Sequence, residues 1–244
     1  KACHPTLHDD VSIYILADPI ANAVCVWEGT IYVHLGLLQR MESEAQLAHI
    51  IGHELAHYYR RHSISQMAKK KELFAELKGD LRRNKRRDAK AEKRNTGLLL
   101  AALSQYQKHG RENESDADTG GLRYMLKTEY ALEEAITGMA MLEKSDEPYF
   151  TKLIDFNKHF AFEGSPFNPK WLLYEADSTW HESREMPDSL RTHPDCDTRM
   201  ALLSSLPVIS SREGKAFVQP KETFDYIKAA ATFEMLELFH RIGA

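Results

Sequence analysis

The chain has 244 residues, of which 43% are hydrophobic and 28% charged, and its formal net charge is −4. This composition is typical of a globular protein and is sufficient for one sizeable domain with a buried core. It excludes a membrane-spanning helix of about 20 residues, because the longest uncharged apolar run, residues 97–103, is far too short.

Three segments near the start of the chain predict a small antiparallel sheet. Residues 11–17 are rich in β-branched and aromatic side chains and end at Asp18-Pro19, which predicts a strand closed by a turn. Residues 23–27 and 30–34 predict two further strands joined by the turn at Glu28-Gly29.

A helix is expected next, led into by Gly36 and continuing to about Met67. Ser43 followed by Gln46 forms a capping box, which marks a helix start. An apolar row with a 3.6-residue period should bury one side of this helix, and its members are Leu47, Ile51, Leu55 and Tyr58.

This helix contains the sequence His53-Glu54-Leu55-Ala56-His57. Residues four apart share a helix face, so His53 and His57 can offer imidazole nitrogens to one metal ion with Glu54 beside it. This is the His-Glu-x-x-His arrangement of zinc hydrolases. A chance match in a chain of this composition has odds of about one in twenty, so the rest of the sequence must support the interpretation.

A basic segment follows. Between Lys69 and Arg94 there are 12 Lys or Arg against 5 Asp or Glu, a net charge of +7 that leaves −11 for the rest of the chain. Residues 82–94 offer only alanines for burial, which predicts a protruding helical hairpin or a mobile tip. Such an arm fits either an anionic membrane surface or a simply solvated helical face. Nucleic acid is not expected as a partner, because residues 82–94 contain no aromatic side chains for bases to stack on.

Candidates for a third metal ligand lie further along the chain. Residues 98–106 resume an apolar helix, and another helix should begin near Glu114. Glu114 and Asp118 are four apart on one face, so one can bind a metal while the other holds the second nitrogen of a ligand histidine. Glu72 and Glu76 are rival third ligands, although they lie among lysines on the arm. Spacing alone leaves this choice open.

Two more helices are expected at residues 132–142 and 222–242. The irregular stretch 146–188 between them is rich in aromatic residues and proline, which suits either a second core layer or a cover over a cleft. Residues 1–206 are expected to form one domain that includes the basic arm, about 69–94. Residues 207–244 should form a helical extension, the start of a longer helical region and a surface for a protein partner.

The three cysteines, Cys3, Cys25 and Cys196, form no Cys-x-x-Cys pair. We expect buried or free thiols, with a Cys3–Cys25 bridge as the alternative.

Several motifs, in this order, resemble the HtpX-like and type I CAAX prenyl protease family of zinc metalloendopeptidases, especially its soluble, cell-envelope branch. The resemblance covers roughly residues 10–206. It rests on Asn22-Ala23, the stretch 29–38, Gly52 to His57 with Arg61-His62, Glu114 to Asp118 with Gly120-Gly121, and Thr192-His193-Pro194 with Arg199. It implies an α+β, mainly α, zincin-like fold with a small antiparallel sheet beside the motif helix. The family's membrane-embedded members carry spanning helices that are absent here, and residues 146–188 match nothing in it.

The resemblance also implies one zinc ion held by His53, His57 and Glu114, with Asp118 supporting a ligand histidine. Three protein ligands leave an open position for water, which characterises a catalytic rather than a structural zinc site. Glu54 would then act as the general base.

For the remaining chemistry, the resemblance implies His193 as the oxyanion donor, with Arg199 anchoring it or donating directly. A metal contact by His193 in a resting, self-blocked enzyme is a further hypothesis. Substrate is expected to add as an extra strand along Ala23, Val24 and Cys25.

The expected function is a zinc endopeptidase of the periplasm or cell envelope that cleaves unfolded or misassembled polypeptides. One alternative is a catalytically weak, chaperone-like scaffold that keeps the zinc fold. The other is a membrane-docking module that acts through its basic arm.

Overall fold

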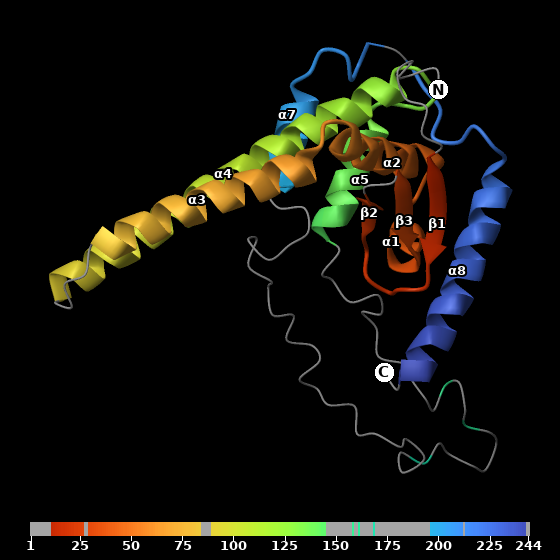
Figure 1. Ribbon diagram of the computed structural model, residues 1–244. Helices are drawn as coiled ribbons and strands as arrows, with labels where there is room; N and C mark the ends of the chain where they lie inside the picture. Colours follow the sequence, from red (N-terminus) through yellow and green to blue (C-terminus); the bar gives the residue numbers. More distant parts are fainter. Residues whose placement is uncertain are drawn as a thin grey trace.

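The fold is described from a computed structural model of the chain (Figure 1). It describes residues 11–26, 29–83, 89–144, 196–211 and 213–242, with residues 158, 161 and 168. His193 therefore lies outside the described residues, as does the irregular stretch 146–188 apart from residues 158, 161 and 168. Within the described part, no helix is both long enough and apolar enough to cross a membrane.

Three strands form where the sequence predicts them: β1 (Ser12–Leu16), β2 (Ala23–Val26) and β3 (Thr30–His34). The sheet order is β1-β3-β2, with β2 antiparallel to β3 and β1 parallel to it. The prediction of an all-antiparallel sheet is therefore wrong for β1. The turn at Gly29 (φ 76°) folds β3 back onto β2, and β3 then enters between the first two strands. As the central strand, β3 is paired along both edges, and its residues Ile31 and Val33 are buried.

The segment before the motif helix is a separate short helix, α1 (Leu35–Arg40), rather than a direct lead-in. The motif helix, α2 (Glu44–Tyr59), begins with the predicted cap: the Ser43 hydroxyl oxygen accepts a hydrogen bond from the Gln46 backbone N–H at 3.1 Å. The helical conformation is thus interrupted at residues 41–43, and α2 begins in its own direction across the sheet.

The buried side of α2 differs from the prediction. Its expected apolar row is only partly buried, and Leu47, Ile51 and Leu55 pack at the margin of the core formed by the sheet, α1 and helix α8 (Lys221–Ile242). The side that carries His53 and Glu54 is the more deeply buried one, with each residue 5% exposed. His53 is covered at very short range by a second helix, α4 (Ala89–Met125), whereas Glu54 is buried against β2.

The motif helix ends at Tyr59, several residues before the predicted end near Met67. Arg61 adopts a left-handed conformation (φ 55°), and a new helix, α3 (His62–Arg83), begins immediately after it. A left-handed residue cannot continue a right-handed helix, so the chain changes direction here.

Of the two arrangements expected for the basic segment, the described residues 62–83 and 89–125 show the helical hairpin. Helices α3 and α4 (Ala89–Met125) lie side by side and project from the body as an arm (Figure 1). The two helices expected at residues 98–106 and from Glu114 are one continuous helix of 37 residues, about 55 Å long. Gly97 and Gly110 lie within it, because an isolated glycine costs only about 1 kcal/mol in a helix interior.

The remaining described helices close the core. The helices predicted at residues 132–142 and 222–242 appear as α5 (Glu134–Glu143) and α8 (Lys221–Ile242), and α7 (Cys196–Ser204) also forms. One core cluster joins α4, α5 and α7 through Leu122, Met139 and Leu203. Another joins the sheet, α1, α2 and α8, to which α8 contributes Phe224.

Candidate metal centre

Close packing of α2 against α4 builds the site. Gly52 faces Gly121, and a Cβ atom added to Gly121 would lie 2.9 Å from the His53 backbone nitrogen and 3.0 Å from the His49 carbonyl oxygen. Only a residue without a Cβ atom permits so close an approach. The consequence is that side chains of α4 reach the histidines of α2.

Three side chains from these helices converge. His53 Nε2 lies 2.9 Å from His57 Nε2, and the two carboxylate oxygens of Glu114 lie 3.5 Å from His53 Nε2 and 3.3 Å from His57 Nε2. A tetrahedral zinc ion with bonds of about 2.0–2.1 Å places its ligand atoms about 3.3 Å apart. The three donor atoms therefore have the spacing and the chemistry that zinc requires.

The charge around these atoms also favours a divalent cation. Glu54, Glu114 and Asp118 bring three carboxylates against the single guanidinium of Arg199, and all four residues are at most 9% exposed. Burial acts to lower the pKa of His53, but its hydrogen bonds to Asp118 and Glu114 outweigh burial and raise this pKa. Surroundings that stabilise a proton on His53 so strongly also stabilise a metal cation placed there.

Asp118 and Arg199 fix the ring of His53. Asp118 Oδ1 lies 2.8 Å from His53 Nδ1, the nitrogen that faces away from Glu114. Arg199 donates to both oxygens of Asp118, at 2.7 and 2.6 Å, and its Nη1 lies 3.2 Å from Glu114. Burial alone would raise the pKa of Asp118, but these hydrogen bonds hold it well below its ordinary value.

A second group of polar residues lies behind His57. His57 Nδ1 is 3.0 Å from His62 Nδ1, and His62 Nε2 is 3.1 Å from Asp116 Oδ2. The sequence analysis found no role for His62 and did not consider Asp116. The left-handed residue Arg61, which creates this contact, leaves no recognisable signal in a local sequence pattern.

Glu54 faces the sheet rather than α4. Its Oε2 accepts a hydrogen bond from the Cys25 backbone N–H at 3.0 Å. Since β2 is an edge strand of the sheet, this amide points out of the sheet toward α2. The strand along which substrate is expected to add, Ala23 to Cys25, therefore lies directly beside Glu54. Cys25 is a thiol in this structure, and Cys3 lies outside the described residues.

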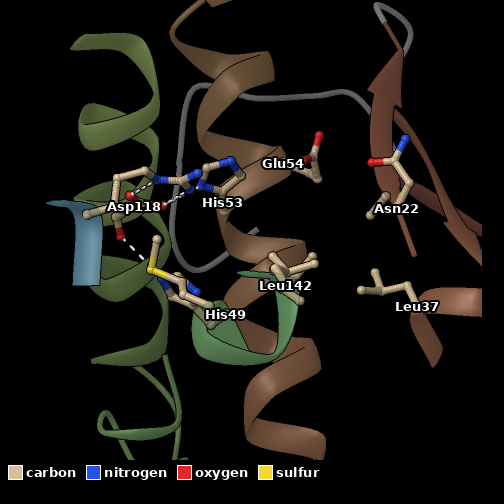
Figure 2. A pocket seen from close by; sticks show the side chains of 11 residues that line it. Asn22, Leu37, His49, His53, Glu54, Asp118 and Leu142 are labelled. Carbon is tan, nitrogen blue, oxygen red and sulfur yellow. Dashed lines mark hydrogen bonds and ion pairs between the residues drawn. The ribbon is translucent and has the colours of Figure 1, made fainter. Parts of the chain in front are cut away.

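A pocket opens between Glu54 and the start of β2 (Figure 2), where Glu54 lies between His53 and Asn22. Its lining is largely apolar and includes Leu37, Met139 and Leu142. The space inside is small, about that of one water molecule.

The remaining predicted residues are placed as follows. Glu72 and Glu76 are exposed on α3, so among the described residues it is Glu114, not either rival, that joins the two histidines. Arg199 binds Asp118 and Glu114, a role that the sequence analysis missed. His193 lies outside the described residues, and its contact with Arg199 stays a prediction.

Residues 4–206 match peptidase family M48. A stretch of 50 residues is 42% identical to the mitochondrial metalloendopeptidase OMA1 of Arabidopsis thaliana, covering 20% of this chain and 10% of that protein. The chain thus matches about a tenth of that relative's length. Because the family match spans most of the chain, the protein belongs to peptidase family M48, a family of zinc metallopeptidases.

Proposed function

We propose that this chain is a zinc-dependent endopeptidase whose metal is held by His53, His57 and Glu114. The observation that carries the proposal is the convergence of these three donors from two helices. Three protein ligands suit a catalytic site, because a tetrahedral ion keeps one position for water or substrate.

The chain's own residues divide the work around that ion. A bound zinc ion supplies Lewis-acid chemistry, polarising a carbonyl and lowering the pKa of water toward 7. Glu54, whose Oε2 already faces the edge strand at Cys25, accepts a proton from the attacking water and returns it to the leaving amine. Asp118 holds His53 in one orientation and tautomer. His193 is the proposed oxyanion donor. A contact between His193 and the metal in the resting enzyme is a further hypothesis.

The proposed substrates are extended segments of unfolded or misassembled polypeptides. An extended segment can pair with the edge of β2 along Ala23, Val24 and Cys25, with main-chain hydrogen bonds providing affinity. The Cys25 N–H, which donates to Glu54 in this structure, would exchange that hydrogen bond for one to the substrate.

Within family M48, we place the chain on the HtpX-like and type I CAAX prenyl protease side and propose the periplasm or cell envelope as its compartment. The support is the motif resemblance of residues 10–206. The similarity to the Arabidopsis protein covers too little of that protein to transfer its compartment or substrates.

The replacement Glu54→Gln tests the activity. With an unfolded casein as substrate, we expect the cleavage rate to fall by about 10²–10⁴-fold, because the general base is lost while the metal ligands stay. Bound zinc, measured by mass spectrometry, should be unchanged. Glu72→Gln, the same change on an exposed residue of α3, should cleave at the wild-type rate.

The chaperone-like alternative gives a different pattern. A scaffold would bind unfolded casein with the same affinity in wild type and in Glu54→Gln, and neither protein would cleave it. If Glu54→Gln cleaved casein at the wild-type rate, this would contradict the proposed role of Glu54.

The arm offers a second candidate function, docking on an anionic membrane surface. One side of α3, at the helical spacing i, i+4, i+7, i+11, carries Met67, Lys71, Phe74 and Lys78. Met67 is 73% and Phe74 51% exposed. At about 100° per residue, Glu72 and Glu76 fall on the opposite side of α3. Exposed apolar groups beside lysines, without acids among them, suit a lipid interface.

Vesicle binding tests this second candidate. We expect the double replacement Lys71→Gln/Lys78→Gln to weaken binding to phosphatidylserine vesicles by about 30-fold, at about 1 kcal/mol per lysine. Lys108→Gln/Lys127→Gln removes the same charge from two other exposed lysines and is the control. Equal binding by both variants, or equal binding to neutral vesicles, would contradict a docking role.

A protein partner that binds through α8 stays a proposal. Two aromatic side chains of this helix, Tyr226 and Phe233, are 75% and 74% exposed.

A further inference from the structure

We propose that His62, together with Asp116, positions the metal ligand His57 by holding the ring nitrogen that faces away from the metal. This inference rests on the metal ligation proposed above. It makes His62 a positioning residue rather than a ligand.

The orientation of the rings carries the inference. His57 Nε2 faces His53 Nε2 at 2.9 Å and Glu114 Oε1 at 3.3 Å, so this nitrogen points into the ligand cluster. The other nitrogen of the same ring, Nδ1, lies 3.0 Å from His62 Nδ1. The two rings meet edge to face, with centroids 4.9 Å apart. His62 therefore contacts the side of His57 that cannot reach the metal.

These contacts fix the tautomers in series. A neutral imidazole has one donor and one acceptor nitrogen, so His57 carries its proton on Nδ1 when Nε2 binds a cation. His62 Nδ1 must then accept that proton's hydrogen bond, and His62 Nε2–H donates to Asp116 Oδ2 at 3.1 Å. Arg60 Nη1 pairs with the other carboxylate oxygen of Asp116 at 2.5 Å, which orients the carboxylate toward His62.

The break between α2 and α3 makes the contact possible. On one continuous helix, residues five apart point about 140° away from each other, so His57 and His62 could not meet. Arg61, with φ 55°, interrupts the helix, and α3 begins at His62. Among the described residues it is the one non-glycine residue with positive φ. The unusual conformation thus coincides with the turn that returns His62 to His57.

Helix α4 then supports both ligand histidines. Asp118 contacts His53 directly, and Asp116 contacts His57 through His62. The same helix supplies the third ligand, Glu114. Groups that hold the second nitrogen of a ligand histidine typically contribute 10–100-fold to metal affinity.

Zinc affinity tests the role. We expect His62→Phe, which keeps a ring but removes both hydrogen bonds, to bind zinc 10–100-fold more weakly in a competition with a chromophoric chelator. His62→Gln should recover part of the affinity, because its amide can accept from His57 and donate to Asp116. Cobalt substituted for zinc should show an altered visible spectrum in His62→Phe. His109→Phe removes a histidine that contacts Ser65 on the arm and should bind zinc like wild type.

Zinc binding by His62→Phe within twofold of wild type would overturn the inference. Should that variant not fold, Asp116→Ala decides the question, because Asp116 is 50% exposed in its side chain and its loss should be tolerated. We expect several-fold weaker zinc binding, and unchanged binding would again overturn the inference. Absence of zinc binding by wild type would instead refute the proposed function itself.

Discussion

At the scale of single residues, Arg199 holds the carboxylates of the site in place. It is 3% exposed and contacts both Asp118 and Glu114, so it offsets two buried negative charges that point toward the histidines. A buried charge left without its partner is strongly destabilising. The stability of the site therefore depends on a residue 81 positions away from Asp118.

Replacing Arg199 by Met tests this dependence. The charge is lost while much of the volume is kept, so we expect the free energy of unfolding of the metal-free protein to fall by about 3–5 kcal/mol. Urea denaturation measures it. Arg123→Met, on an exposed position of α4, should change it by less than about 0.5 kcal/mol. A similarly small effect of Arg199→Met would contradict the account.

Asp118 gives the stability a defined pH dependence. Its pKa is held below its ordinary value in the folded protein, so its contribution to stability is present above the unfolded pKa, about 3.9, and is lost as the pH falls toward the folded pKa. We expect the metal-free protein to lose stability from about pH 5 downward, more steeply than Asp118→Asn. Thermal unfolding at a series of pH values measures both slopes, and parallel slopes would contradict the prediction.

The residue pattern predicted part of the site. His53, Glu54 and His57 are recognisable because helical spacing places two histidines on one face, and the spacing of Glu114 and Asp118 made them candidates. His62 and Asp116 could not be predicted, because their contacts depend on the backbone turn at Arg61. The anchoring of Asp118 by Arg199 was equally invisible, since it joins helices far apart in the sequence.

At the scale of elements, the distance between α2 and α4 decides whether the ligands meet. A Cβ atom on Gly120 would lie 2.5 Å from the Ala56 Cβ, whereas a Cβ on Gly97 of the same helix would meet nothing within 4 Å. The two glycines therefore differ in function although both lie within α4.

Alanine replacements separate these two roles. Gly97→Ala should raise the free energy of unfolding by about 0.5–1 kcal/mol, because alanine favours a helix more than glycine does. Gly120→Ala should lower it by about 1–3 kcal/mol through overpacking against α2, and zinc affinity should fall with it. Circular dichroism melting and chelator competition measure the two quantities. Equal stabilisation by both replacements would show that the helix contact is not tight.

Most elements could be predicted because their signals are local. Ser43 and Gln46 marked the start of α2, and Gly29 marked the turn between β2 and β3. The parallel pairing of β1 with β3 is a contact across the sheet and leaves no local pattern. The burial of the histidine side of α2 was missed because it depends on α4 rather than on apolar periodicity.

At the scale of the whole molecule, the ion would link two parts of the fold. His53 and His57 belong to α2, which packs on the sheet, whereas Glu114 belongs to α4, which continues into the arm (Figure 1). A ligand that binds only the folded state stabilises it by about 4 kcal/mol at a concentration 1,000 times its Kd.

Metal removal should therefore lower the melting temperature. For a chain of this size 4 kcal/mol corresponds to a shift of roughly 8–16 °C. Differential scanning calorimetry before and after treatment with a chelator measures the shift, and added zinc should reverse it. An unchanged melting temperature would indicate that α2 and α4 are not joined by a metal.

The most direct test of the central claim is the zinc content of purified wild type, Glu114→Ala and Glu76→Ala, measured by inductively coupled plasma mass spectrometry. If Glu114 completes the site with His53 and His57, wild type and Glu76→Ala each hold one zinc ion per chain and Glu114→Ala holds almost none. Full zinc content in Glu114→Ala, or its loss in Glu76→Ala, would contradict the account.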